Sequence, residues 1–167
     1  ENRLCKPYIR EHFLYERFGD LTEFVKANYL VVSGYQCFDL HPDYDTQRKI
    51  EEKLTIEPDA TPEMRSRIER IIQGLYSLIS EVIFLRAPAT DGNAFFPRHT
   101  LHFTRSYQEL DNQAKHIINE IYLDYYYRRN EEFWKGKAMQ KLPVLKNATN
   151  MLLCGEDLGM VPACVPD

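Results

Sequence analysis

The chain has 167 residues, of which 44% are hydrophobic and 28% are charged, and its formal net charge is −4. Such an apolar content predicts a folded protein rather than a disordered one, and the length fits one domain, alone or with part of another. The acidic balance excludes nucleic-acid binding driven by overall charge, although not by a local patch. The longest apolar run, Val82–Leu85, is far too short to span a bilayer, which excludes a membrane protein of that kind.

The sequence favours a cytoplasmic location. It has no apolar segment of a secretory signal, and because it also lacks an initiator Met we expect that Glu1 is not the first residue of the natural protein. The spacing of the four cysteines matches neither a zinc site nor a small disulfide scaffold, which favours reduced thiols. They are Cys5, Cys37, Cys154 and Cys164.

Two short helices are predicted at the start of the chain. The first covers residues 7–18 and ends at Gly19. Residues 20–23 then have the Asp-x-x-Glu spacing of a capping box, so we expect Asp20 to open a second helix. The side chains expected to face the core from these helices are Tyr8, Phe13, Leu14, Leu21, Phe24 and Val25.

The following segment combines an extended signal with two helical ones. Residues 35–40 favour a short strand that runs into a turn at residues 41–43, and residues 46–54 favour a short charged helix. The strongest helical pattern covers residues 62–79, with Thr61 as N-cap and a proline at the first helical position. Its predicted apolar stripe contains Met64, Ile68, Ile71, Ile72, Leu75 and Ile79.

The middle of the chain is less regular. Residues 81–86 fit either a continuation of the long helix or a strand, because the apolar run is too short to decide. Residues 95–103 are aromatic and extended in character. Helical periodicity returns at residues 111–130, with Ala114, Ile117, Ile118, Ile121 and Tyr125 on one side.

A last helix is expected at residues 131–141, with Pro143 ending it. The apolar run Met151–Cys154 closes on Gly155 and predicts a strand, with a new helix beginning near Pro162. Strand, loop and helix start together resemble half of a βα unit.

Several sequence features have an ordinary structural explanation. His99 and His102 lie three apart, but no third metal ligand is apparent, so we expect surface or hydrogen-bonding histidines and no metal or cofactor. Residues 125–129 mix tyrosines with arginines, yet consecutive residues of a helix point in different directions, which favours a segment that is half core and half solvated face. Trp134 is expected in a core or an interface rather than against a sugar ring.

Two carboxylates, Glu156 and Asp157, follow the predicted strand at residues 151–154. Functional groups of barrels and α/β sheets lie at such strand ends, and the flanking glycines leave room for a ligand. An apolar surrounding raises the pKa of a carboxyl group toward the range of a general acid. On the residues alone, the pair equally fits a helix N-cap followed by a first-turn acid.

Residues 153–162, Leu-Cys-Gly-Glu-Asp-Leu-Gly-Met-Val-Pro, resemble the acid/base strand of the amylomaltases, the 4-alpha-glucanotransferases of glycoside hydrolase family 77. Further blocks resemble one subgroup, formed by plant cytosolic disproportionating enzymes and Bacteroides-type forms. This subgroup carries a long insertion in its catalytic (β/α)8 barrel, between the nucleophile strand and the acid/base strand. The further blocks are residues 5–9, 17–20, 96–98, 124–127 and 142–145.

The resemblance implies a fold, an activity and a division of the chain. The expected fold is mostly α: a helical insertion with a few short strands at residues 1–110, then helices that return to the barrel and the acid/base strand at residues 111–167. The implied reaction is a retaining transfer of α-1,4-glucan segments between maltooligosaccharides, with Glu156 as general acid/base and Asp157 in a substrate-orienting role. Such transfer requires no cofactor, membrane or nucleic acid.

The resemblance also implies that part of the catalytic machinery lies outside this chain. No block within residues 1–167 matches the family's nucleophile or its third carboxylate. The segment alone is therefore expected to be inactive. Another hypothesis remains: a non-catalytic helical module that binds a partner or a glycan. A different barrel enzyme using the same Glu-Asp pair is a third.

Overall fold

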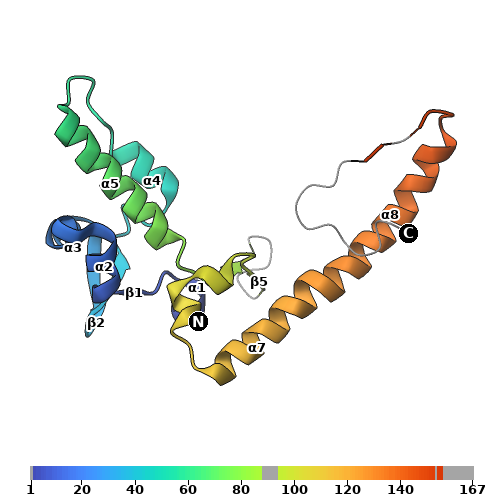
Figure 1. Ribbon diagram of the computed structural model, residues 1–167, viewed down its shortest axis with the longest axis horizontal. Coiled ribbons are helices and arrows are strands. Elements are labelled where there is room, and N and C mark those ends of the chain that lie inside the picture. Colours follow the sequence, from blue (N-terminus) through green and yellow to red (C-terminus); the bar gives the residue numbers. More distant parts are fainter. Residues whose placement is uncertain (1, 88–93, 153, 156–167) are drawn as a thin grey trace. The chain divides into compact units, whose positions relative to one another are not determined.

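The structure is a computed structural model that describes residues 2–87, 94–152 and 154–155 (Figure 1). The described chain is mostly helical with a few short strands, as the sequence predicts. It divides into two compact units, Glu1–Leu110 and Asp111–Asp167. No helix in the described ranges is both long and apolar enough to cross a membrane.

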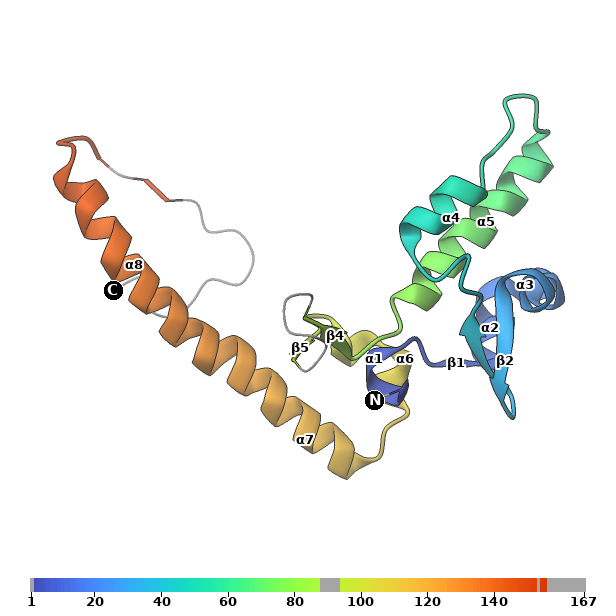
Figure 2. The same ribbon diagram turned by 180° about the vertical axis from the view of Figure 1, so that it is seen from behind.

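A three-stranded antiparallel sheet lies beside α2 and α3 in the first unit (Figure 2). Its strand order is β1-β3-β2, and its register pairs Ile9 with Phe38 and Leu30 with Leu40. The elements of this region are α1 (Asn2–Cys5), β1 (Ile9–Arg10), α2 (Glu11–Phe18), α3 (Thr22–Tyr29), β2 (Leu30–Gly34) and β3 (Cys37–Leu40). The predicted strand at residues 35–40 thus exists as β3, although β2 was not predicted.

The first predicted helix begins four residues later than expected. Ile9 and Arg10 are extended and pair with β3, so the helix covers only Glu11–Phe18. Pairing with a distant strand overrides the local helical pattern here. Its predicted end is confirmed, because Gly19 has φ +56°, a conformation that favours glycine.

The predicted capping box at Asp20 is wrong. A short 3₁₀ turn, η1 (Gly19–Leu21), precedes α3, and the N-cap position is Leu21, which has no side-chain cap. The Asp20 carboxylate instead accepts a hydrogen bond from Arg70 Nη2 at 2.9 Å. A long-range ion pair therefore replaces the local cap.

The helices α4 (Gln47–Lys53) and α5 (Pro62–Ile79) agree with the sequence prediction. The hydroxyl groups of Thr46 and Thr61 accept hydrogen bonds from the backbone N–H groups three residues later, as N-caps do. Met64 is 56% exposed, so the apolar stripe of α5 enters the core only after its first turn.

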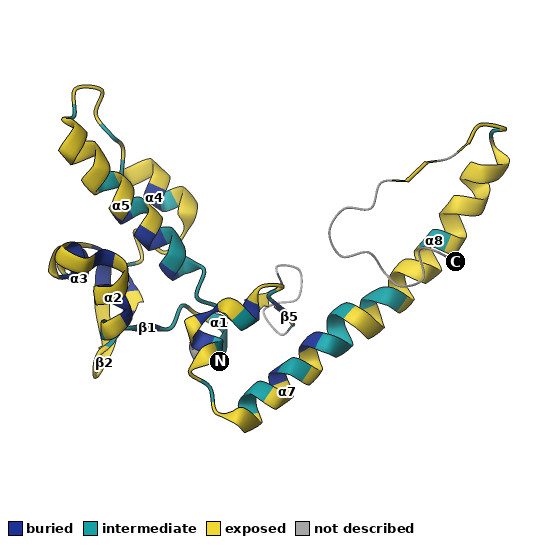
Figure 3. Cartoon of the chain, viewed as in Figure 1, coloured by how far each residue is buried: buried dark blue, intermediate teal, exposed yellow. Residues whose placement is uncertain are grey.

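The core of the first unit lies where α2, α3, α4, α5 and the sheet meet, as the buried positions in Figure 3 show. Phe24, expected in this core, is 40% exposed and lies under the Arg67 guanidinium at 4.7 Å. The buried cluster comprises Ile9, Leu14, Phe18, Leu21, Val25, Tyr29, Leu30, Phe38, Leu40, Ile50, Ile71, Leu75 and Leu78.

The irregular middle segment forms a hairpin followed by two short helical turns. The strand alternative for residues 81–86 is realised as β4 (Phe84–Arg86), which pairs antiparallel with β5 (Phe95–Pro97). The 3₁₀ turn η2 (Leu101–Phe103) and the short helix α6 (Arg105–Gln108) complete the first unit.

The second unit contains α7 (Asn112–Leu123), a wider π-helical turn η3 (Asp124–Arg129) and α8 (Asn130–Asn147). The predicted end of α8 at Pro143 is wrong, because the helix continues to Asn147 with the proline inside it. Ile118 is buried as expected, whereas Ile117 and Ile121 are 53% and 39% exposed.

Candidate functional site

The two carboxylates singled out in the sequence, Glu156 and Asp157, lie outside the described residues. A few residues earlier in the chain, Met151 and Leu152 are 75% and 88% exposed. Neither they nor Cys154 belongs to a strand, so the buried strand predicted at residues 151–154 is wrong at these positions. A barrel strand needs hydrogen bonds from neighbouring strands, and none occurs among the described residues of the second unit.

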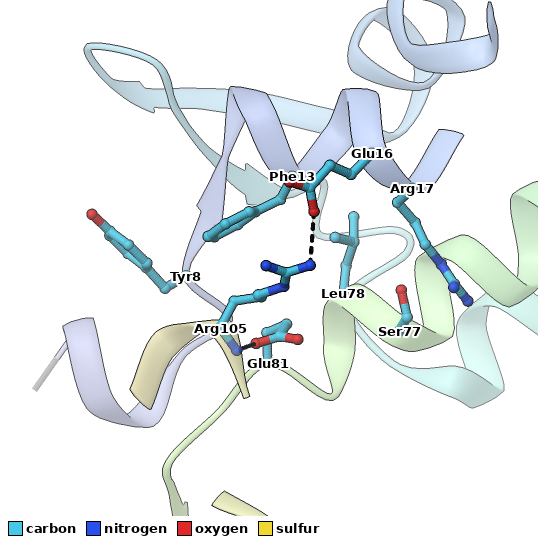
Figure 4. Close-up of a pocket in the computed structure, with 8 residues that line it drawn as sticks. All are labelled: Tyr8, Phe13, Glu16, Arg17, Ser77, Leu78, Glu81 and Arg105. Carbon is cyan, nitrogen blue, oxygen red and sulfur yellow. Dashed lines mark hydrogen bonds and ion pairs between the residues drawn. The ribbon is translucent and has the colours of Figure 1, made fainter. Parts of the chain in front are cut away.

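A pocket of about 280 Å³ lies in the first unit, where α2, the end of α5 and the start of α6 come together (Figure 4). Its volume is close to the lower end of the roughly 300–1,000 Å³ typical of small-molecule sites. The lining residues are Tyr8, Phe13, Glu16, Arg17, Ser77, Leu78, Glu81 and Arg105.

The Arg105 guanidinium lies in the middle of this group (Figure 4). Its Nη2 donates a hydrogen bond to Glu16 Oε2 at 2.8 Å, and its Cζ lies 5.7 Å from the Phe13 ring centroid. The Arg105 and Glu16 side chains are 51% and 55% exposed, respectively. Such an exposed pair contributes little stability, but a ligand can reach both of its charged groups.

Glu81 positions the backbone that carries Arg105. Its Oε2 accepts hydrogen bonds from the backbone N–H groups of Arg105 at 2.7 Å and Ser106 at 3.4 Å. The Ser106 hydroxyl, which is fully buried, donates in return to the Glu81 backbone oxygen at 3.1 Å. The first turn of α6 is thus attached by three hydrogen bonds to Glu81, which follows α5 in the chain.

The opposite side of the pocket is formed by Arg17 and Ser77. Arg17 Nη2 donates to the Gln73 backbone oxygen at 3.2 Å, and the Ser77 hydroxyl donates to the Gly74 backbone oxygen at 2.8 Å. A guanidinium has five N–H donors, so this anchor leaves Arg17 with further donor capacity. The Ser77 hydroxyl retains acceptor capacity in the same way.

Sequence reasoning did not find this pocket. Its residues come from three separated segments, residues 8–17, 77–81 and 105, and only the fold brings them together. The one local signal was Thr104, whose hydroxyl caps α6 by accepting from the Tyr107 N–H at 3.1 Å. That signal locates a helix start but says nothing about a pocket.

An ion-pair network lies on another part of α2. Lys26 Nζ donates to Glu11 at 2.6 Å and to Glu23 at 3.1 Å. These hydrogen bonds, that to Glu11 first, raise the pKa of Lys26. A hydrogen bond from the Tyr15 hydroxyl lowers the pKa of Glu23. Each of these groups already has a partner, so the network holds α2 and α3 together.

No group of three or more His, Cys, Asp or Glu side chains suited to a metal occurs in the described part of the chain, which includes His99 and His102. The His102 ring packs edge-on against Tyr107, with centroids 4.9 Å apart. The described cysteines Cys5, Cys37 and Cys154 form no disulfide with one another. Arg10 Nη1 donates to Cys37 Sγ at 3.1 Å, a contact that raises the pKa of Arg10.

The tyrosine-rich turn η3 contains no buried residue, so the core half of its prediction is wrong, whereas the solvated half is confirmed at residues 127–129. Tyr126 lies 4.7 Å from Tyr122 between ring centroids, and burial raises its pKa, whereas Tyr127 is 54% exposed. Arg129 Nε is paired with Asp124 at 2.6 Å. Trp134 is 57% exposed in the described structure, which removes the core alternative of its prediction and leaves the interface alternative.

Comparison with known proteins relates the whole chain to one kind of enzyme. Over 164 residues, 98% of its length, the chain is 36% identical to "4-alpha-glucanotransferase DPE2" of rice, Oryza sativa subsp. japonica, and it spans 17% of that relative. The match confirms the resemblance to 4-alpha-glucanotransferases indicated by the sequence blocks. No protein-family model matches the chain, and no solved structure matches it.

Proposed function

We propose that the chain is a segment of a 4-alpha-glucanotransferase that transfers α-1,4-glucan segments between maltooligosaccharides in the cytoplasm. The observation that carries this proposal is the 36% identity to the rice enzyme over 98% of the chain. The Gly-Glu-Asp-Leu-Gly block at residues 155–159 adds a chemically specific motif.

In the proposed reaction, Glu156 acts first as an acid and then as a base. Its protonated carboxyl group gives a proton to the glycosidic oxygen while a nucleophilic carboxylate, supplied from outside this chain, forms an ester bond with the anomeric carbon. The leaving sugar departs with that proton. The Glu156 carboxylate then removes a proton from the acceptor hydroxyl, whose oxygen attacks the same carbon and breaks the ester bond. Two inversions give net retention.

Asp157 is proposed to orient the substrate or the acid/base side chain beside it. Group transfer from one sugar hydroxyl to another conserves oxidation state and charge, so the proposal includes no cofactor. Its partners are the α-1,4-glucan donor and acceptor, without nucleic acid or membrane.

The first unit is proposed to be an insertion in a catalytic (β/α)8 barrel. A residue near its beginning contacts one near its end, because His12 Nε2 lies 3.2 Å from Glu109 Oε1. An inserted domain needs such proximity to enter and leave its host at one place.

The second unit is proposed to return the chain to the barrel and to carry the acid/base strand. Its long helix α8 has no buried residue in the structure, yet it carries many apolar side chains. Barrel helices use such side chains to pack on the strands. The exposed apolar residues of α8 are Phe133, Trp134, Met139, Leu142, Val144 and Leu145.

The test of Glu156 is the substitution Glu156→Gln in the full-length protein that contains this chain. With maltotriose as donor and acceptor, loss of the acid/base group is expected to slow transfer by about 10²–10⁴-fold. Glu132→Gln removes an exposed carboxylate of α8 and is the matched control, with unchanged turnover expected.

A second glycosyl donor distinguishes the loss of the acid/base group from misfolding of the variant. α-Maltosyl fluoride has a leaving group that needs no proton, so Glu156→Gln should still form the glycosyl-enzyme from it, and added azide should trap a glycosyl azide of retained configuration. Near-normal turnover of maltotriose by the Glu156→Gln variant would remove this residue from the mechanism.

A further inference from the structure

We propose that the pocket of Figure 4 is a binding subsite for a maltooligosaccharide, built into the first unit. The inference rests on the proposed function, which supplies the class of sugar. The chemical character of the pocket is argued from its own residues.

The charges around the pocket favour a neutral ligand. The lining contains two carboxylates, Glu16 and Glu81, and two guanidinium groups, Arg17 and Arg105, so the formal charges balance. A site for an anion or a cation would have an excess of the opposite charge. The lining therefore suits a neutral molecule with many hydrogen-bond donors and acceptors, which describes a sugar.

The polar groups also have a suitable shape. Guanidinium and carboxylate groups are planar and bind two neighbouring atoms at once, as adjacent hydroxyl groups of a pyranose require. The Arg105–Glu16 pair presents one of each at 2.8 Å from one another. Glu81 holds the backbone of Arg105 in place, so the group that meets the ligand is already ordered.

An aromatic side chain provides the apolar contact that one face of a sugar ring needs. Phe13 is only 8% exposed and is covered by Arg105, whereas Tyr8 is half-buried, borders the pocket and has the Arg10 guanidinium carbon 5.8 Å from its ring centroid. We therefore expect Tyr8 to pack against the C–H groups of a glucose unit. The volume of about 280 Å³ suits a short stretch of glucan rather than a long one.

The experiment follows hydrogen–deuterium exchange of the full-length protein while it is titrated with maltoheptaose. Sugar bound in the pocket is expected to slow exchange in peptides that cover residues 8–18, 77–82 and 104–108. Peptides around residues 154–160 report on sugar at the proposed catalytic residues in the same sample.

Four variants connect this protection to the named side chains. Tyr8→Ala and Arg105→Ala are each expected to raise the sugar concentration for half-protection of the pocket peptides by about tenfold or more. Tyr8→Phe keeps the ring and should stay near the wild-type value. Tyr35→Ala, at the 86% exposed tip of the β2–β3 hairpin, is the matched control and should have no effect.

Each of the following outcomes supports or overturns the proposed subsite. The subsite is supported if Tyr8→Ala and Arg105→Ala weaken the protection of the pocket peptides and Tyr8→Phe retains it. Protection around residue 156 without protection at the pocket overturns the subsite and leaves the proposed function intact. Pocket protection that neither alanine variant weakens also overturns it. A protein that shows neither maltotriose transfer nor protection anywhere loses both the proposed function and the subsite.

Discussion

Gly74 lies in α5 at the point where the Phe18 ring comes closest to the helix. A Cβ atom at position 74 would collide with Cε1, Cζ and Cδ1 of that ring. Phe18 is 1% exposed and belongs to the core cluster, so its ring has no free space into which to move. Glycine is therefore required here by packing, despite its low helix propensity.

We expect Gly74→Ala to lower the free energy of unfolding by about 1–3 kcal/mol, the usual cost of overpacking a core. Urea unfolding of the chain, followed by circular dichroism, measures this. Adding Phe18→Leu should make the double variant lose less than the two single losses combined. Gly136→Ala is the control, because nothing lies near its added Cβ and alanine favours a helix by roughly 1 kcal/mol. A Gly74→Ala variant as stable as wild type would contradict the packing argument.

The Asp20–Arg70 ion pair predicts a dependence of stability on pH. The hydrogen bond from Arg70 is the main cause that lowers the pKa of Asp20 in the folded state. A lowered folded-state pKa means that the pair stabilises the fold above the unfolded-state pKa of about 3.9, and that this stabilisation disappears as the pH falls through the folded-state value.

Accordingly, Asp20→Asn should lower the midpoint of thermal unfolding at pH 7, and the difference from wild type should shrink as the pH falls below about 4. Asp59→Asn is the control, because no ion pair or hydrogen bond of the described structure involves its exposed carboxylate. An Asp20→Asn effect that is equal at pH 7 and pH 3 would show that the ion pair is not its cause.

At the scale of the element, α8 presents the clearest departure from the sequence pattern. Pro143 lacks an N–H group and cannot donate to the carbonyl of Met139, yet the helix continues to Asn147. We expect the backbone amides of residues 145–147 to exchange with solvent more slowly than those of residues 150–152, which have no helix. Pro143→Ala should slow exchange further in the same turn, because it restores the missing donor. Equally fast exchange in both segments would place the end of the helix at the proline instead.

Helices with local caps could be predicted closely from the sequence. Thr46 and Thr61 are N-cap residues that indicate the beginnings of α4 and α5. The apolar spacing after Thr61 predicts the buried face of α5 from Ile68 onward. The beginning of α2 could not be predicted in this way. Ile9 and Arg10 became a strand because they pair with residues almost 30 positions away, and a local pattern contains no information on such pairing.

The two candidate sites also differ in whether their residues are contiguous in sequence. Glu156 could be proposed as a candidate because the motif around it is contiguous in sequence, at residues 153–162. The pocket was not found because its lining comes from residues that local patterns assign to separate roles: Tyr8 to a core, Arg105 to no predicted element. The contacts of Glu81 with α6 and the hydrogen bond from Arg105 to Glu16 reveal that these residues meet.

At the scale of the whole molecule, the chain is proposed to supply the acid/base carboxylate of the reaction, and no block within residues 1–167 matches the nucleophile of the family that it resembles. We therefore expect the 167-residue chain alone to be inactive in glucan transfer. Incubation with maltotriose, followed by chromatography of the products, should show no glucose and no longer maltooligosaccharides. The full-length protein under the same conditions is the positive control, and product formation by the chain alone would refute its assignment as a partial enzyme.

The bond between Arg105 and Glu16 joins residues 89 positions apart, and that between His12 and Glu109 joins residues 97 apart. During translation, α2 therefore emerges from the ribosome long before the residues that close its outer side have been synthesised. Until α6 has been synthesised, the N-terminal part of the first unit lacks these contacts. Phe13 and Tyr8 are not covered by Arg105 during this time. A nascent chain stalled shortly before residue 105 should consequently be more easily cut by a protease near α2 than one stalled well beyond it.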